Sequence, residues 1–135
     1  MDVLTVDFAG ELSEVTSDST LSIGRRADLT LDDDPGLDDQ AFEVVYEDRL
    51  WWLKATGARL TAAVSAPGGV LLGTVRPGGR IPLIVSPTTV TFSVGSTTYE
   101  LFLDVPKAPY GVQLRPQAQT PPRVDTLRFT ASQRL

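Results

Sequence analysis

Apolar and polar residues alternate with a period of two along most of this chain. Residues 3–8 and 90–94 show the pattern most clearly, with Leu4, Val6 and Phe8 separated by polar neighbours. A period of two places successive side chains on opposite faces of a β-strand. The same interpretation extends to eight further segments, which makes about ten short strands. These further segments are residues 21–23, 29–31, 42–46, 51–53, 60–64, 70–75, 81–85 and 99–103.

Two Pro-Gly-Gly triplets, at residues 67–69 and 77–79, separate neighbouring strands. Proline suits the second position of a β-turn and glycine accepts the positive φ of the third, so we predict type II turns on both sides of strand 70–75. The alternative is a glycine-rich phosphate cradle, but both triplets lack the following helix and the lysine of such loops.

No stretch before residue 104 has the 3.6-residue period of an amphipathic helix, and turn residues punctuate the chain throughout. The sequence therefore predicts an all-β fold, an antiparallel β-sandwich of about ten strands that spans residues 1–105 and is followed by a Pro-rich C-terminal extension.

The character of the sequence changes after Asp104. Five prolines fall within residues 106–122, where alternation stops, and this indicates an extended linker of polyproline type. In residues 123–135, Thr130-Ala-Ser-Gln133 fits a helix capping box preceded by a hydrophobic staple residue, Phe129. We interpret residues 123–135 as the start of a helical segment that continues past Leu135, because so few residues cannot sustain a helix. The alternative is a tail in which the motif arose by chance.

Composition removes most catalytic chemistry, because the chain contains no cysteine and no histidine. Thiol nucleophiles, disulfides, imidazole bases and the commonest zinc and iron ligands are therefore excluded. The two lysines, Lys54 and Lys107, stand outside any recognisable motif, and no carboxylate pair meets the requirements of an active site. We expect a protein that is not an enzyme and that uses neither a cofactor nor a metal.

The formal net charge of −5 disfavours direct nucleic-acid binding by residues 1–105. DNA binding would need a basic domain after Leu135. No apolar run is long enough for a membrane helix, and the acidic start of the chain lacks the features of a secretory signal. We therefore expect a cytoplasmic protein without membrane contact.

Several segments in order resemble the forkhead-associated (FHA) family. They are Leu21-Ser-Ile-Gly-Arg-Arg26, the acidic loop of residues 27–35, the strand pair 43–53 with its Trp52-Leu53, and Gly57. The resemblance covers roughly residues 3–104 and implies a β-sandwich that binds phosphothreonine peptides. The chain is similar to actinobacterial regulators in which an FHA-like domain precedes a helix-turn-helix region.

In that family the phosphate is held by an arginine after the first glycine, by a serine in a Ser-Arg-x-His loop, and by a serine or threonine and an asparagine in a Gly-Ser-x-Asn-Gly loop. Arg25 matches the arginine. The remaining positions depart from the pattern: Asp38 and Asp39 replace Ser-Arg, Ala41 replaces histidine, and Ala58-Arg59-Leu60 replaces Ser-x-Asn.

A carboxylate in place of the serine hydroxyl repels phosphate, by about 4 kcal/mol for two charges 4 Å apart at an effective dielectric constant near 20. The resemblance thus implies a degenerate phosphothreonine site. We predict that Arg25 pairs with Asp38 or Asp39 and that Asp38→Asn has a small effect on stability, as for an exposed ion pair.

Other features leave alternatives. One is an acidic cluster that comprises Asp28, Asp32, Asp33, Asp34, Asp38 and Asp39. Such a cluster suggests calcium binding, but its spacing does not match the EF-hand pattern, and a solvated acidic loop also explains it. Trp51 and Trp52 are adjacent on one strand, so one faces the core while the other is either partly covered or anchors a partner.

The sequence predicts a phosphorylation-independent protein–protein interaction or sensing module of a cytosolic regulatory protein, with transcription as the setting that the resemblance suggests. Its partner is a protein that the sequence does not identify. Two alternatives stay open: a phosphothreonine-peptide reader with a rearranged pocket, and a small-ligand or calcium-binding sandwich.

Overall fold

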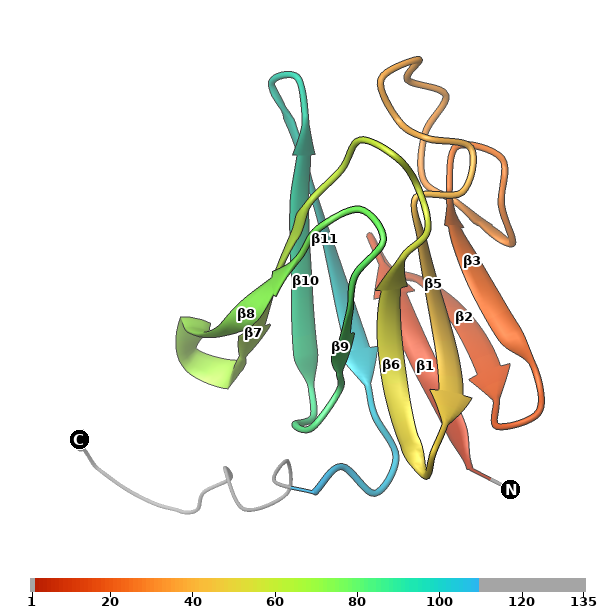
Figure 1. Cartoon of the computed structure of the whole chain (residues 1–135), viewed down its shortest axis with the longest axis vertical. Helices are drawn as coiled ribbons and strands as arrows, with labels where there is room; N and C mark the ends of the chain where they lie inside the picture. Colours follow the sequence, from red (N-terminus) through yellow and green to blue (C-terminus); the bar gives the residue numbers. More distant parts are fainter. Residues whose placement is uncertain (1, 110–135) are drawn as a thin grey trace.

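A computed structural model describes residues 2–109, which form eleven strands in two stacked sheets and one short 3-10 turn (Figure 1). The six-stranded sheet has the order β2-β1-β11-β10-β7-β8, and the five-stranded sheet has the order β4-β3-β5-β6-β9. The strands are β1 (Val3–Phe8), β2 (Glu11–Thr16), β3 (Thr20–Gly24), β4 (Leu29–Thr30), β5 (Phe42–Glu47), β6 (Leu50–Ala55), β7 (Ala62–Ala66), β8 (Val70–Val75), β9 (Arg80–Pro82), β10 (Thr88–Val94) and β11 (Thr97–Asp104).

The predicted all-β sandwich is confirmed. Every segment assigned to a strand from the sequence overlaps a strand of the structure, with ends displaced by a few residues; segment 60–64, for example, corresponds to β7 (Ala62–Ala66). Pairing is antiparallel except between β3 and β4, which are parallel over two residues each.

Strand β2 is the one that alternation did not predict. Its two apolar residues, Leu12 and Val15, are three positions apart, so they fall on opposite faces of the strand. Val15 is buried and Leu12 is 65% exposed. This arrangement is possible because β2 is an edge strand of the six-stranded sheet, where charged residues such as Glu11 and Glu14 also discourage unwanted pairing.

Alternation builds the core between the two sheets. In β11, Tyr99, Leu101 and Leu103 are buried, whereas the residues between them are exposed. Phe42 of β5 meets Phe92 of β10 with ring centroids 4.8 Å apart, so this aromatic pair joins the two sheets. Replacing a fully buried phenylalanine with alanine costs about 3–5 kcal/mol, which makes this contact a main support of the sandwich.

Both Pro-Gly-Gly segments adopt the backbone that the sequence predicts. Gly68 and Gly78 have φ values of 84° and 85°, the left-handed values that a type II turn needs at its third position. The first segment is also the 3-10 turn, Pro67–Gly69, and together the two segments flank β8. The β7–β8 hairpin extends to one side of the sandwich (Figure 1).

The last strand ends at Asp104. Most of the predicted linker and all of the predicted helical segment lie in residues 110–135, outside the described part of the chain. Within residues 2–109, no helix has the length and apolar character needed to cross a membrane.

Candidate functional site

Three connections gather at one end of the sandwich (Figure 1). They are the β3–β4 loop, the β4–β5 loop and the β6–β7 loop, which carry all six site residues predicted from the sequence. Backbone hydrogen bonds tie them together: the N–H groups of Arg25 and Arg26 donate to the carbonyls of Asp38 and Asp39, and Gly57 N–H donates to the carbonyl of Ala41. We call this region the loop end.

Gly24 allows the first two loops to approach each other. A Cβ atom on this residue would lie 2.7 Å from the carbonyl oxygen of Asp38 and 2.9 Å from the backbone nitrogen of Ala41. These distances are closer than real Cβ contacts, and the obstacles are backbone atoms that cannot rotate away. The packing of the two loops therefore requires glycine at position 24, and this requirement does not depend on any ligand.

Asp38 is the centre of the loop end. Its side chain is 13% exposed, and its carboxylate accepts hydrogen bonds from the backbone N–H of Arg59 at 3.2 Å and from Nε of Arg59 at 2.8 Å. Arg59 also donates from Nη2 to the carbonyl of Pro35 at 3.3 Å. Gly57 gives the carboxylate room, because a Cβ there would lie 2.9 Å from Cγ of Asp38. Asp38 and Arg59 thus join the β4–β5 loop to the β6–β7 loop.

The predicted pairing of Arg25 with Asp38 or Asp39 is wrong. Nε of Arg25 lies 2.9 Å from Oδ1 of Asp33, and Arg59 holds Asp38. Only the backbone of Arg25 contacts Asp38, through the N–H bond to its carbonyl. The carboxylate of Asp38 points toward the β6–β7 loop, where it meets two donors of Arg59. The sequence suggested that Asp38 lies near Arg25. The direction of the Asp38 side chain, however, is decided by the β6–β7 loop, which contains Arg59.

The two ion pairs of the loop end differ in exposure. The Arg25 side chain is 25% exposed while its partner Asp33 is 88% exposed. In the second pair the acid is the covered member, because Asp38 is 13% exposed and Arg59 is 54% exposed. An exposed carboxylate such as Asp33 can leave its partner at little cost. Asp38, in contrast, is mostly covered and is held by two hydrogen bonds from Arg59.

The other predicted positions lie at the rim. Asp39 and Ala58 are exposed, and Leu60 is half-buried against the core. In residues 2–109 the Asp39 carboxylate has no ion-pair partner. The loop end therefore brings all six predicted residues together, but it joins them in pairs that the sequence did not predict.

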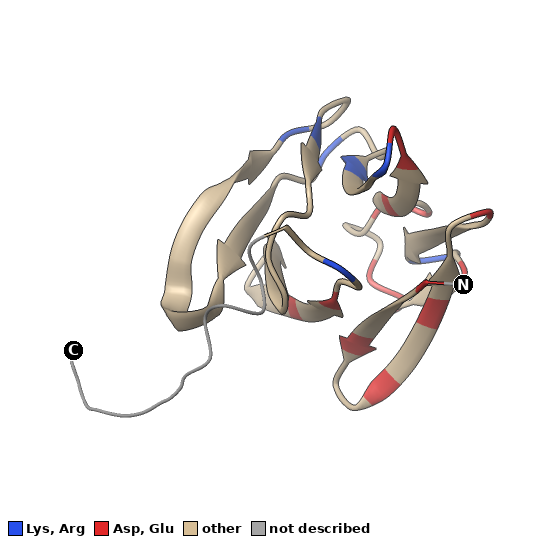
Figure 2. Cartoon of the chain, turned by 90° about the horizontal axis from the view of Figure 1, so that it is seen from below, with Lys and Arg blue, Asp and Glu red and all other residues tan. Residues whose placement is uncertain are grey.

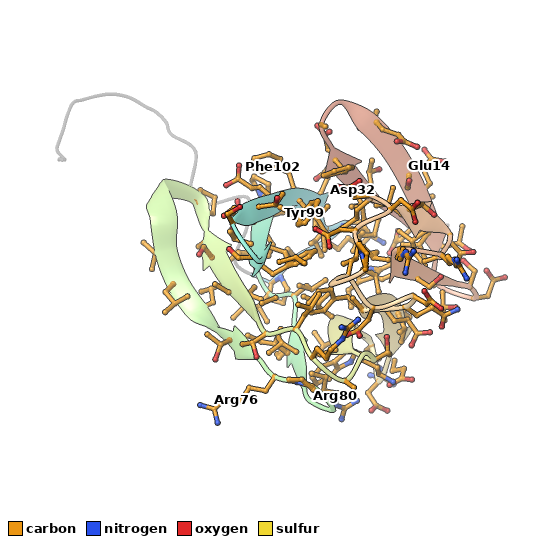
Figure 3. The ribbon with its side chains drawn as sticks, turned by 90° about the horizontal axis from the view of Figure 1, so that it is seen from above. Glu14, Asp32, Arg76, Arg80, Tyr99 and Phe102 are labelled. Atoms are coloured by element: carbon orange, nitrogen blue, oxygen red, sulfur yellow. The ribbon has the colours of Figure 1, made fainter. Side chains whose placement is uncertain are left out.

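The acidic residues of the β4–β5 loop have separate structural partners. The hydroxyl of Tyr99 donates to Asp32 at 2.8 Å, and the N–H of Gly36 donates to Asp34 at 2.8 Å. The hydrogen bond from Tyr99 lowers the pKa of Asp32, while burial and Asp32 raise the pKa of Tyr99 to about 12. No group of three potential metal ligands converges within residues 2–109. The Asp32–Tyr99 contact anchors the loop to β11; both residues are labelled in Figure 3.

Tyr99 and Asp33 were missed as site residues by sequence reasoning. Tyr99 is 67 positions from Asp32 in the sequence. The alternation of residues 99–103 identified Tyr99 only as a core residue of a strand. Asp33 was considered only as a member of the acidic cluster, whereas Asp38 or Asp39 was predicted to pair with Arg25. No signal in the sequence distinguishes either contact, because both depend on how separate loops meet.

Trp51 and Trp52 occupy the two faces expected of strand neighbours. Trp51 is 3% exposed and packs edge-on against Tyr46, with centroids 5.2 Å apart. Trp52 is half-buried: Cζ of Arg80 lies 4.0 Å above its ring, and its Nε1 donates to the carbonyl of Glu47. The second tryptophan is thus a partly covered structural residue.

Several solved structures that resemble this fold are FHA domains. An engineered FHA domain solved with a Myc-pTBD peptide superposes with a TM-score of 0.61 at 14% identity, covering 79% of this chain and 94% of that domain. The FHA-1 domain of Mycobacterium tuberculosis Rv1747 gives 0.54 at 16% identity, covering 76% and 95%. The FHA1 domain of yeast Rad53 gives 0.58 at 15% identity, covering 79% of each chain.

No family model matches the sequence, and no curated protein matches it. The structural comparisons place this chain among FHA-like β-sandwiches. At 14–16% identity, the likeness concerns the fold.

Proposed function

We propose that this chain is a protein–protein interaction module, not an enzyme, whose loop end recognises an unmodified segment of a partner protein. The observation that carries the proposal is the ion pair between Asp38 and Arg59. It puts a covered carboxylate, with both of its oxygens used by the chain itself, where an FHA-like site would offer a hydroxyl to phosphate.

Electrostatics support recognition that is independent of phosphorylation. A phosphate at the loop end would meet the negative charge of Asp38, whose carboxylate is held there by two hydrogen bonds from Arg59. The alanine and leucine at positions 58 and 60 offer no side-chain donor in place of the family's hydroxyl and amide. The exposed rim residues, such as Arg26, Gln40 and Ala58, remain accessible to a peptide.

The test compares matched peptides. An oriented phosphothreonine peptide library and its unphosphorylated counterpart are titrated against the full chain by fluorescence anisotropy, and unmodified peptides are selected by display. We expect no phosphate-dependent binding and selection of unmodified peptides that fail to bind an Arg26→Glu/Ala58→Glu variant. An Asp18→Lys variant, changed at an exposed turn away from the loop end, serves as control.

One observation favours a second candidate, a phosphothreonine reader with a rearranged pocket. Arg25 keeps its position after the glycine, and its exposed partner Asp33 is easily displaced. This candidate predicts phosphate-dependent binding that disappears in Arg25→Ala and strengthens in Asp33→Asn. That pair of results would overturn the phosphorylation-independent proposal.

A cytosolic regulatory role is part of the same proposal and is supported by sequence features alone. The resemblance to FHA-like domains of actinobacterial regulators is its basis. Localisation of a tagged full-length chain tests it.

A further inference from the structure

The outer face of the six-stranded sheet contains an uncovered apolar hollow. Its volume is about 410 Å³, and Leu12, Phe102 and Pro87 line it together with Thr5, Asp7 and Asp104. The strand register places Leu12, Asp7 and Phe102 in one row across β2, β1 and β11. Leu12 is 65% exposed and Phe102 is 42% exposed. Two large apolar side chains therefore face solvent, one on either side of a carboxylate.

Next to the hollow this face is polar on β10, as the solvent side of an antiparallel sheet normally is. Two other exposed apolar side chains that the register places on this face, Val3 and Leu71, do not line the hollow. Across from Phe102 on β10 is Thr89, and the next outward positions on that strand are Thr91 and Ser93. Apolar side chains rimmed by polar residues on a soluble protein mark an interaction site when they form a hollow. Leu12 and Phe102 meet that description.

Charge identifies what would occupy the hollow. None of the six strands of this sheet contains a lysine or arginine. The outer face carries four carboxylates, Asp7, Glu14, Glu100 and Asp104, and within residues 2–109 none of them is in an ion pair. Figure 3 shows Phe102 and Glu14 on one side of the molecule, with Arg76 and Arg80 on the opposite side.

The carboxylates are arranged around the apolar pair. The register places Glu14, Thr5 and Asp104 in the neighbouring row of the same face, two residues along each strand from Leu12, Asp7 and Phe102. Two residues along a strand correspond to roughly 7 Å. Acidic groups thus stand next to each apolar side chain, at a spacing that lysine and arginine side chains can span. Acidic residues colour the strands near the N-terminus in Figure 2, whereas the β7–β8 hairpin has none.

We propose that this face binds a basic segment of a partner protein, in which lysine or arginine residues flank one large apolar side chain. The apolar side chain would enter the hollow between Leu12 and Phe102, and the cations would pair with Glu14, Asp7 and Asp104. Complementary charge of this kind steers association and selects partners. The surface differs from the loop end, so it stands independently of the function proposed above.

The experiment titrates the full chain with the probe peptide Lys-Lys-Leu-Lys-Lys and with Lys-Lys-Ser-Lys-Lys, followed by isothermal calorimetry or by amide chemical shifts. We expect binding of the leucine peptide, weakened by salt. Phe102→Thr and Glu14→Lys should each reduce its affinity about tenfold, the usual effect of removing an interface anchor. If Phe102→Thr fails to fold, Leu12→Thr replaces it.

Matched controls separate a specific site from general attraction to an acidic protein. Val70→Thr removes a residue of the same sheet that is 61% exposed but lies outside the hollow. Asp48→Lys changes the net charge as much as Glu14→Lys does, at the exposed turn between β5 and β6. Both should leave affinity within about twofold of the parent, as for unrelated surface positions.

Three results would overturn the proposal. The first is equal weakening by Glu14→Lys and Asp48→Lys, and the second is equal affinity for the leucine and serine peptides. The third concerns residues 110–135, which contain four arginines and one aspartate. If replacing those arginines with glutamine strengthens peptide binding about tenfold or more, the occupant is this chain itself and not a partner.

Discussion

The carboxylate of Asp38 accepts two hydrogen bonds from Arg59, one from the backbone N–H and one from Nε, although the two residues are 21 positions apart. The contact crosses from the β4–β5 loop to the β6–β7 loop and joins them at the loop end. It is therefore both a structural tie and the reason for the proposed change of ligand.

Asp38→Ala should destabilise the domain by about 1–2 kcal/mol, because it removes hydrogen bonds to a charged acceptor from a largely covered position while Arg59 can still reach solvent. This expectation replaces the small effect predicted for an exposed pair with Arg25. Urea unfolding of the full chain measures it. The control is Asp39→Ala, the exposed neighbour, which should change stability by less than about 0.5 kcal/mol. Equal effects would show that the tie to Arg59 contributes nothing.

Gly57→Ala should be more harmful while the carboxylate of Asp38 is present. The added Cβ would lie 2.9 Å from Cγ of Asp38, so the carboxylate must shift away from Arg59. Overpacking of this kind costs about 1–3 kcal/mol. In an Asp38→Ala background the carboxylate is gone and only the Cβ of residue 38, 3.0 Å from the added atom, remains, so a double-mutant cycle should give a coupling of about 1 kcal/mol or more.

Gly24→Ala provides the contrast for this cycle. Its Cβ would meet backbone carbonyls, which no side-chain deletion relieves. Its cost should therefore be the same with and without Asp38. Additive effects at Gly57 as well as at Gly24 would contradict the packing that the structure gives to the loop end.

Arg80→Ala should change the fluorescence of Trp52 with little effect on stability. Arg80 covers the ring at 4.0 Å and is held by Glu47, which Lys54 also contacts. Its removal exposes the indole to water, so we expect a red-shifted emission from that residue, and a cost of about 0.5–1 kcal/mol. Trp51 is buried, so its emission should not change. A Trp52→Phe variant, in which Trp51 is the remaining tryptophan, gives the emission of Trp51 alone. Unchanged emission in Arg80→Ala would show that Arg80 does not cover the ring in solution.

The domain should lose stability at high pH through Tyr99. Burial and the neighbouring Asp32 raise the pKa of Tyr99 to about 12, above its ordinary value of 10.0. Because the folded pKa is the higher one, the folded state prefers the neutral phenol. The contribution to stability is complete below pH 10.0 and is lost as the pH rises toward about 12. Asp32 acts at the other extreme: its pKa is lowered from 3.8, so its contribution is present above that value and lost as the pH falls.

Ultraviolet absorbance of tyrosinate, recorded together with circular dichroism, checks the prediction at Tyr99. The difference between the parent chain and Tyr99→Phe should show a phenol that ionises only as the fold is lost, and the variant should lack this part of the alkaline destabilisation. Ionisation of Tyr99 near pH 10 in the folded protein would contradict the expected shift.

Local sequence determined the strands, the turns and the fold class. Period-two alternation specifies which side chains of β1, β10 and β11 enter the core, since a strand has only two faces. Pro67-Gly68 and Pro77-Gly78 fix their turns because their backbone preferences act over adjacent residues. Alternation did not predict strand β2, because its two apolar residues, Leu12 and Val15, do not share a face.

The tertiary structure alone decided the partners of charged side chains. Arg25 had six acidic candidates within a short stretch of sequence, and it takes Asp33, while Asp38 takes Arg59 from another loop. The outer-face hollow depends likewise on Leu12 and Phe102 being brought into one row by register between β2, β1 and β11. Alternation is a local property set by backbone geometry, whereas ion pairs and surface hollows form between segments that only the packed fold brings together.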